Sequence, residues 1–206
     1  MAAAVVPKKS LWRKAKKRKV PNINLDIIIN ATGLLHVGNY KPERTFREIN
    51  YDYLNEIFKI NTFSPFLISK YFSPLLNKNH TSIIAFLSAR LGSISDNSLG
   101  GWYSYRSSKA ALNSYVKNIS WVLAKQGIRI NAVAPGNLIF EGSVWDHKTK
   151  DDYNAVNFML EKEVALGRLG KIEEITNLVL FLSSNVSSFT TGSIFVSDGG
   201  QIKSWL

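Results

Sequence analysis

The sequence of 206 residues contains no cysteine and only three histidines. Without cysteine, disulfides, thiolate metal ligands and cysteine nucleophiles are excluded. His36, His80 and His147 stand far apart and lack the spacing of metal ligands, so no metal site is predicted. No apolar run reaches the roughly 20 residues that a bilayer requires, so no membrane span is predicted either.

Acidic residues are missing from the first twenty positions. Between Lys8 and Lys19 there are eight Lys or Arg residues, which leaves three of the eleven net positive charges for the rest of the chain. We interpret residues 1–22 as a basic tail and residues 23–206 as one domain. The tail is a solvated segment, a targeting signal or an arm that contacts nucleic acid through residues 8–19. KKRKV resembles a nuclear-import signal, and the acid-free composition is also typical of an organellar presequence, so the compartment, cytoplasmic or organellar, stays open.

From residue 24 onward, short apolar runs alternate with helical patterns. This order predicts an α/β fold with right-handed crossovers and a parallel sheet that helices cover on both faces. Ser64–Pro65 is expected to begin a second helical segment within the first long helix, since proline suits a first turn. We expect strands at residues 25–30, 82–88, 128–134 and 193–197, and helices at residues 52–76, 104–125, 153–166 and 172–183.

Tyr105 and Lys109 open the second long helix. Residues four apart share a helical face, so the phenol and the ammonium can converge on one site. A nearby cation favours phenolate and would lower the tyrosine pKa, which makes a general acid or base usable near neutral pH. The alternative is a surface pair without a function, because this spacing arises easily by chance in a chain rich in lysine.

Several ordered motifs decide between these readings. SIIAFLSARLGSISDNSLGGWYSYRSSKAALN resembles the C-factor-like branch of the short-chain dehydrogenase/reductase family. RINAVAPGN and LGRLGKIEEITNLVLFLSSNVSSFTTGSIFVSDGG resemble the C-terminal half of its 3-oxoacyl-carrier-protein-reductase-like members. The resemblance covers residues 24–201 and implies a Rossmann-like domain that is an NAD(P)-dependent oxidoreductase of small carbonyl or alcohol substrates.

The resemblance also assigns roles in the site. It implies that Tyr105 exchanges a proton with the substrate oxygen and that Lys109 assists it, with Asn61 supporting a water relay to the lysine. The family often has a second serine where this chain has Ala89, so Ser88 is the candidate for the serine role and Ser93 is the alternative.

Further positions resemble the cofactor turns of the family and the start of its substrate lid. The lid begins near Val144 and Trp145, and Trp145 either stacks on substrate or packs within the lid. The positions that the resemblance places at NAD or NADP are Asn30, Gly33, Tyr105, Lys109, Pro135 and Gly136.

The family's glycine-rich loop has no counterpart in the sequence, because no Gly-x-x-x-Gly-x-Gly spacing occurs. Such glycines let the backbone approach a pyrophosphate, so we expect weak dinucleotide binding and a fold that lacks the first strands. The strand at residues 25–30 then becomes an exposed edge, which the tail, a neighbouring subunit or a foreign partner must cover. The chain is therefore expected to be a homo-oligomer or a subunit of a larger complex. The alternative function is a non-catalytic structural or binding subunit that reuses the fold and whose basic arm contacts nucleic acid or a large assembly.

Overall fold

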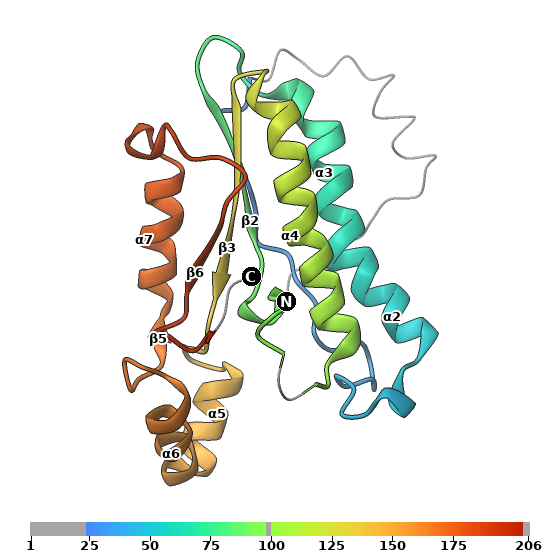
Figure 1. Ribbon diagram of the computed structural model, residues 1–206, viewed down its shortest axis with the longest axis vertical. Coiled ribbons are helices and arrows are strands. Elements are labelled where there is room, and N and C mark those ends of the chain that lie inside the picture. Colours follow the sequence, from blue (N-terminus) through green and yellow to red (C-terminus); the bar gives the residue numbers. More distant parts are fainter. Residues whose placement is uncertain (1–23, 98–99, 204–206) are drawn as a thin grey trace.

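A computed structural model describes residues 24–97 and 100–203 (Figure 1). Its main sheet has four parallel strands in the order β1-β2-β3-β6, as the alternation of strands and helices predicts. The strands are β1 (Ile27–Asn30), β2 (Ser82–Leu87), β3 (Ile128–Pro135) and β6 (Ile194–Ser197), and β4 (Leu138–Ile139) pairs with β5 (Gly170–Lys171) in a small second sheet. The helices of two turns or more are α2 (Tyr51–Phe58), α3 (Ser64–Phe72), α4 (Tyr103–Ala124), α5 (Val144–Asp151), α6 (Tyr153–Glu163) and α7 (Ile172–Leu182).

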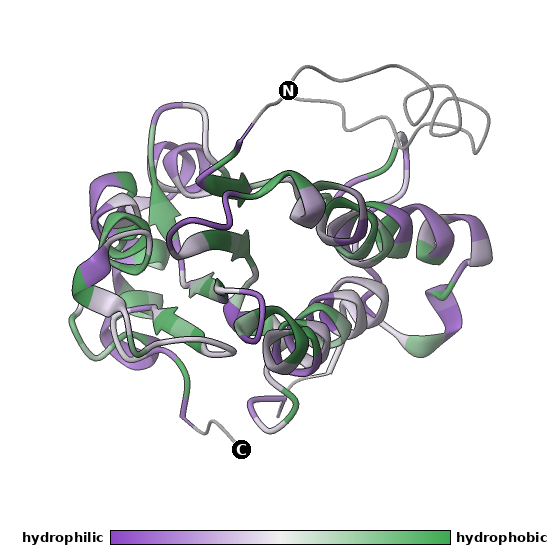
Figure 2. Cartoon of the chain, turned by 90° about the horizontal axis from the view of Figure 1, so that it is seen from above, coloured by the Kyte–Doolittle hydropathy of each residue, from purple (hydrophilic) through white to green (hydrophobic). Residues whose placement is uncertain are grey.

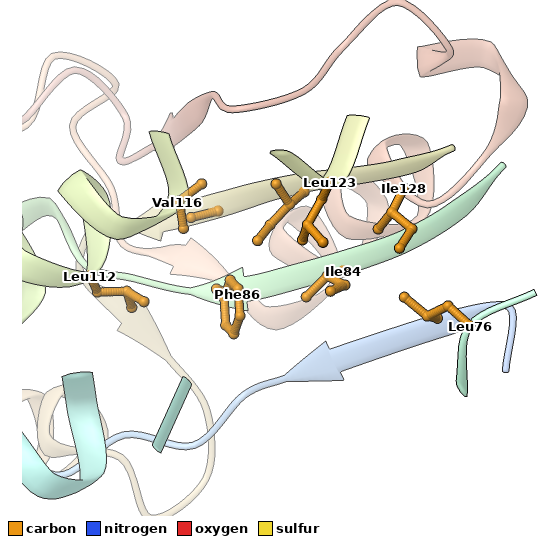
Figure 3. Packing of buried hydrophobic residues seen from close by; sticks show 9 residues of the cluster. Leu76, Ile84, Phe86, Leu112, Val116, Leu123 and Ile128 are labelled. Carbon is orange, nitrogen blue, oxygen red and sulfur yellow. The ribbon is translucent and has the colours of Figure 1, made fainter. Parts of the chain in front are cut away.

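The core lies between the sheet and α4. Buried aliphatic and aromatic side chains from β2, β3 and α4 pack together there, and Figure 3 shows them pointing toward one another. Most side chains of the strands are apolar, as Figure 2 shows by colour, because side chains on both sides of a parallel strand are normally covered. Arg129 and Asn131 of β3 are buried polar exceptions. The buried members of this cluster are Leu76, Ile84, Phe86, Leu112, Val116, Leu123, Ile128, Ile130 and Ala132.

Helices cover the two faces of the sheet unequally. Helices α2, α3 and α4 lie on one side, and α7 lies on the other, where Ile175 and Leu182 pack against Val133 of β3 (Figure 1). Ile28 faces the core, so its neighbours in β1 face the other side, and Ile27 and Ile29 are 42% and 57% exposed. Helices thus cover both faces of the sheet, as predicted, but no described helix covers that face of β1.

Helices α2 and α3 form one continuous rod through a π-helical turn, Lys59–Phe63. The expected second segment does begin at Ser64, but no side chain caps it, and the Ser64 N–H donates to the Lys59 carbonyl within the wide turn. Pro65 follows directly and has no N–H to donate, so the wide turn lets the rod continue past it. The turn also brings Asn61, which is fully buried, to the inner face of the rod.

The segment between β4 and β5 forms a pair of helices rather than the single expected one. Asp152 separates α5 from α6, and its side chain accepts a hydrogen bond from Ala155 N–H at the start of α6. Helix α6 ends at Glu163, three residues before the expected end, and the chain turns at Gly167 with a φ of 63°. In the part of the chain that the structure describes, no helix has the length and apolar character of a membrane span.

Candidate functional site

The candidate site lies at the carboxyl edge of the sheet, beside the first turns of α4. Lys109 is 2% exposed, and its Nζ donates to the carbonyl of Leu87, the last residue of β2, at 3.0 Å. The same Nζ lies 5.9 Å from the centre of the Tyr105 ring. It would also lie 3.5 Å from a Cβ at Gly33, which has none. Lysine, tyrosine and the turn after β1 are therefore brought together as the sequence predicts.

Burial governs the protonation of this pair. It raises the pKa of Tyr105 to about 12 and lowers the pKa of Lys109 to about 8. Both changes have the same cause, because an environment of low polarity disfavours the charged form of either group. The expected lowering of the tyrosine pKa by the lysine is thus outweighed by burial. At neutral pH the pair is a neutral phenol next to an ammonium.

Asn61 is tied to both sides of the site. Its Oδ1 accepts from Leu34 N–H at 2.7 Å, and its Nδ2 donates to the Leu34 carbonyl at 2.9 Å. The same Nδ2 donates to Ser108 Oγ at 3.1 Å, and Ser108 Oγ in turn donates to the Tyr105 carbonyl at 2.7 Å. Asn61 thereby joins the segment after β1 to the helix that carries Tyr105.

The two candidate serines differ in their surroundings. Ser88 is buried at the end of β2, and its Oγ donates to Asn113 Oδ1 at 2.6 Å. Asn113 Nδ2 donates to the Gly92 carbonyl at 3.2 Å, which closes a small network between β2 and α4. Ser93 lines a hollow of about 470 Å³ on α4, together with Arg106 among others. Ser88 therefore uses its proton within the protein, and its role toward a substrate stays a prediction, as does that of Ser93.

The turns expected at the cofactor lie at the ends of neighbouring strands. Asn30 ends β1, where its Oδ1 accepts from Thr32 N–H at 2.9 Å, while its Nδ2 is buried without a hydrogen-bond partner among the described residues. A buried donor of this kind fits a ligand rich in hydroxyl acceptors. Pro135 and Gly136 follow at the end of β3, and a Cβ at Gly136 would lie 2.4 Å from Gln201 Oε1. These groups lie where the sequence resemblance places the cofactor, and no Gly-x-x-x-Gly-x-Gly spacing occurs among the described residues.

Trp145 packs inside the α5–α6 pair. It contacts the small cluster formed by Val156, Leu160, Val164 and Leu169, and the Lys148 Nζ lies 4.6 Å from its ring centre. Of the two readings of this residue, the structure shows packing within the lid segment.

Some residues of the site give no signal in the sequence. Glu43 is 1% exposed and accepts hydrogen bonds at the start of α4, and Gln201 Oε1 accepts from Asn137 N–H at 2.9 Å just after Gly136. Both are polar residues outside regular elements, and only the fold brings them to the site. Within residues 24–97 and 100–203, no group of three or more His, Cys, Asp or Glu side chains is placed to hold a metal ion.

The chain is similar to known reductases and oxidoreductases over most of its length. A family model described as enoyl-(acyl carrier protein) reductase matches residues 10–201. An uncharacterized oxidoreductase of Thermotoga maritima is 31% identical over 177 residues, which are 86% of this chain and 67% of that protein. A 3-oxoacyl-(acyl-carrier-protein) reductase of Aquifex aeolicus is 27% identical, over 86% of this chain and 65% of its own length.

Solved structures show the same fold. A 7α-hydroxysteroid dehydrogenase, complexed with NADH and 7-oxo glycochenodeoxycholic acid, superimposes with a TM-score of 0.72 at 25% identity. The match covers 89% of this chain and 66% of that one. The chain thus spans about two thirds of the length of the proteins that it matches.

Proposed function

This chain belongs to the short-chain dehydrogenase/reductase family, and on that premise we propose that it reduces a small carbonyl compound, or oxidises the corresponding alcohol, with NAD(P). The observation that carries the proposal is the buried Tyr105–Lys109 pair beside Gly33. Function depends on the site rather than on the fold, and this pair is the part of the site that can do chemistry.

Tyr105 is suited to donate a proton. Because burial holds its pKa at about 12, the phenol keeps its proton at neutral pH and can give it to a carbonyl oxygen that becomes negatively charged. The bound nicotinamide supplies or accepts the hydride. As the phenolate forms, the Lys109 ammonium stabilises it by Coulomb attraction, so the lysine contributes after the proton has begun to move.

Other residues of the chain would hold the ligands. Lys109 Nζ and the buried Asn30 Nδ2 are the donors that we assign to the hydroxyls of the dinucleotide. Gly33 allows close approach of the ligand, since a side chain there would lie beside Lys109 Nζ. Gly136 is required by the packing of the chain itself, because a Cβ there would collide with Gln201 and Asp198, so we assign it to the shape of the turn. We propose that Ser88, rather than Ser93, is the serine that contacts the substrate oxygen. Asn113 Oδ1 accepts the hydrogen bond of the Ser88 hydroxyl and so holds it in place.

The proposed binding is weak for this chain alone. No Gly-x-x-x-Gly-x-Gly spacing occurs in the sequence, so the backbone contacts that usually hold a pyrophosphate have no counterpart here. We also propose that β1 is covered by a second copy of the chain or by another protein, because an apolar strand edge exposed to water favours association. The non-catalytic alternative with nucleic acid has no observation in its favour, and residues 8–19 lie outside the described residues.

The test follows oxidation of NADH or NADPH with a panel of ketones, aldehydes and oxoacyl thioesters. Tyr105→Phe should lose turnover while the far-UV circular dichroism and melting temperature stay the same, because only the hydroxyl is removed. Tyr115→Phe, on the same helix, is the matched control and should keep full activity. A Tyr105→Phe variant that is as active as the wild type would remove Tyr105 from the mechanism.

A further inference from the structure

Glu43 is a buried carboxylate without a basic partner. Its side chain is 1% exposed, and none of the ion pairs in the described part of the chain includes it. Burying a charge in this way is costly unless hydrogen bonds compensate for lost water. The compensation comes from Ser104, whose N–H lies 3.3 Å from both carboxylate oxygens and whose Oγ donates to Oε1.

These hydrogen bonds give a partner to the Ser104 N–H in the first turn of α4, the helix that carries Tyr105. The residue at the N-cap position is Trp102, whose side chain makes no capping hydrogen bond. A helix leaves its first N–H groups without partners inside the helix, and a negative charge near them is favourable. Glu43, 61 residues away in the sequence, thus performs the task that an N-cap side chain usually performs.

Glu43 also fixes Trp102 itself. Trp102 has a φ of 52°, and among the described residues it alone has a positive φ without being glycine. Such a conformation persists only where neighbours hold it. The main-chain carbonyl of Glu43 accepts from Trp102 N–H at 2.6 Å, and this bond does not depend on the carboxylate. The Trp102 ring then meets the Tyr105 ring edge-on, with 6.3 Å between their centres.

Tyr53 shows that the carboxylate and the phenol occupy one neighbourhood. Its hydroxyl donates to the Leu35 carbonyl at 2.8 Å, in the segment that follows Gly33. Burial, then the charge of Glu43 and then that of Tyr105 raise the pKa of Tyr53 to about 12. The Tyr53 phenol is therefore close enough to be affected by the charges of both Glu43 and Tyr105.

We propose that Glu43 is a positioning residue of the candidate active site, whose carboxylate holds the first turn of α4 and thereby fixes the Tyr105 phenol, while its main-chain carbonyl holds the Trp102 turn. The contacts run along two routes, through Ser104 at the start of the helix and through the ring of Trp102. The functional part of this inference rests on the proposed role of Tyr105, whereas its structural part does not.

The experiment compares Glu43→Ala, Glu43→Gln and Glu48→Ala in the full chain. Glu48 is the matched control, since its exposed carboxylate also accepts a main-chain N–H, that of Arg44 at 2.7 Å. Amide hydrogen exchange and the ring signals of Tyr105 are measured by NMR, and Tyr105→Phe identifies those signals. In Glu43→Ala the Ser104 amide should exchange about tenfold faster and the Tyr105 signals should shift, while Leu112 and Val116 in the same helix stay protected.

Glu43→Gln keeps an acceptor oxygen but loses the charge, so it should speed exchange at Ser104 only about threefold. This variant decides the matter if Glu43→Ala does not fold. Unchanged Ser104 exchange and unchanged Tyr105 signals in the folded variant would overturn the inference, and so would the same changes in Glu48→Ala.

Turnover gives a separate result. If the wild type is active, Glu43→Ala should lower kcat about tenfold with little change in KM. A displaced phenol stabilises the transition state less well but leaves substrate binding unchanged. A changed KM with an unchanged kcat would contradict the positioning role. If the wild type reduces no carbonyl compound, the proposed function fails, and the exchange data still decide whether Glu43 holds the start of α4.

Discussion

Replacing Asn61 with alanine should destabilise the chain more than any comparable change of a polar residue on a helix surface. The side chain is fully buried and makes three hydrogen bonds, two to the backbone of Leu34 and one to Ser108 Oγ. At about 1 kcal/mol of net stabilisation each, their loss amounts to about 3 kcal/mol. Leu34 is half-buried, so water can replace part of the lost hydrogen bonding to its backbone. We therefore expect the free energy of unfolding to fall by about 2 to 3 kcal/mol.

The assay is thermal unfolding followed by circular dichroism, with urea unfolding as a second measure. For a chain of this size the expected loss corresponds to a fall in Tm of about 5 to 10 °C. Asn61→Asp keeps an acceptor but loses the donor and buries a carboxylate beside the Leu34 carbonyl, so at neutral pH it should destabilise the chain at least as much as alanine does. Asn118→Ala is the control, because its exposed amide bonds only within α4, to Ser114, and it should change stability by less than about 0.5 kcal/mol. If Asn61→Ala and Asn118→Ala melt together, Asn61 does not join the two segments as described.

Three further outcomes follow from the same structure. Titration calorimetry of NADH or NADPH into the chain alone should give a dissociation constant well above the low-micromolar range, and low-micromolar binding would show that other contacts replace the glycine-rich loop. Stability should rise with pH from about 8 to about 10, because the unfolded chain still binds the Lys109 proton that the folded chain has released. It should fall above about pH 10, because folded Tyr105 keeps its proton up to about pH 12. Lys109→Met should remove the rise in urea unfolding measured across this range, and an unchanged rise would assign it to another group. Sedimentation at micromolar concentration should show a species larger than the 23.1 kDa chain, and a well-folded monomer would mean that the β1 edge needs no partner.

Much of the fold could be predicted from the sequence, because the central strands are short apolar runs. The boundaries of β2, β3, β6 and α7 differ by at most one residue from those expected. Helix α4 was equally predictable, and with it the shared face of Tyr105 and Lys109. Strand β1 was expected from residue 25 but begins at Ile27, since Leu25 forms only an isolated bridge to Leu76.

The rest depends on contacts between distant segments. Nothing near Glu43 in the sequence indicates burial, because its partners Trp102 and Ser104 lie about 60 residues further on. The hydrogen bond from Ser88 to Asn113 spans 25 residues in the same way. The pKa of Tyr105 could not be anticipated either, since spacing shows the nearby lysine but not the burial that outweighs it.

The π-helical turn Lys59–Phe63 fixes the rotational phase of the rod formed by α2 and α3. Each residue of an α-helix advances about 100° around the axis, so deleting one residue from this turn would rotate one half of the rod by that angle against the other. At present Asn61 faces Leu34, and the Phe66 ring stacks on the Tyr115 ring with 3.7 Å between their centres. After such a deletion the rod could keep one of these two contacts but not both. The length of this segment is therefore as constrained as its composition, and a one-residue gap here should be harder to accommodate than a substitution at most of its positions.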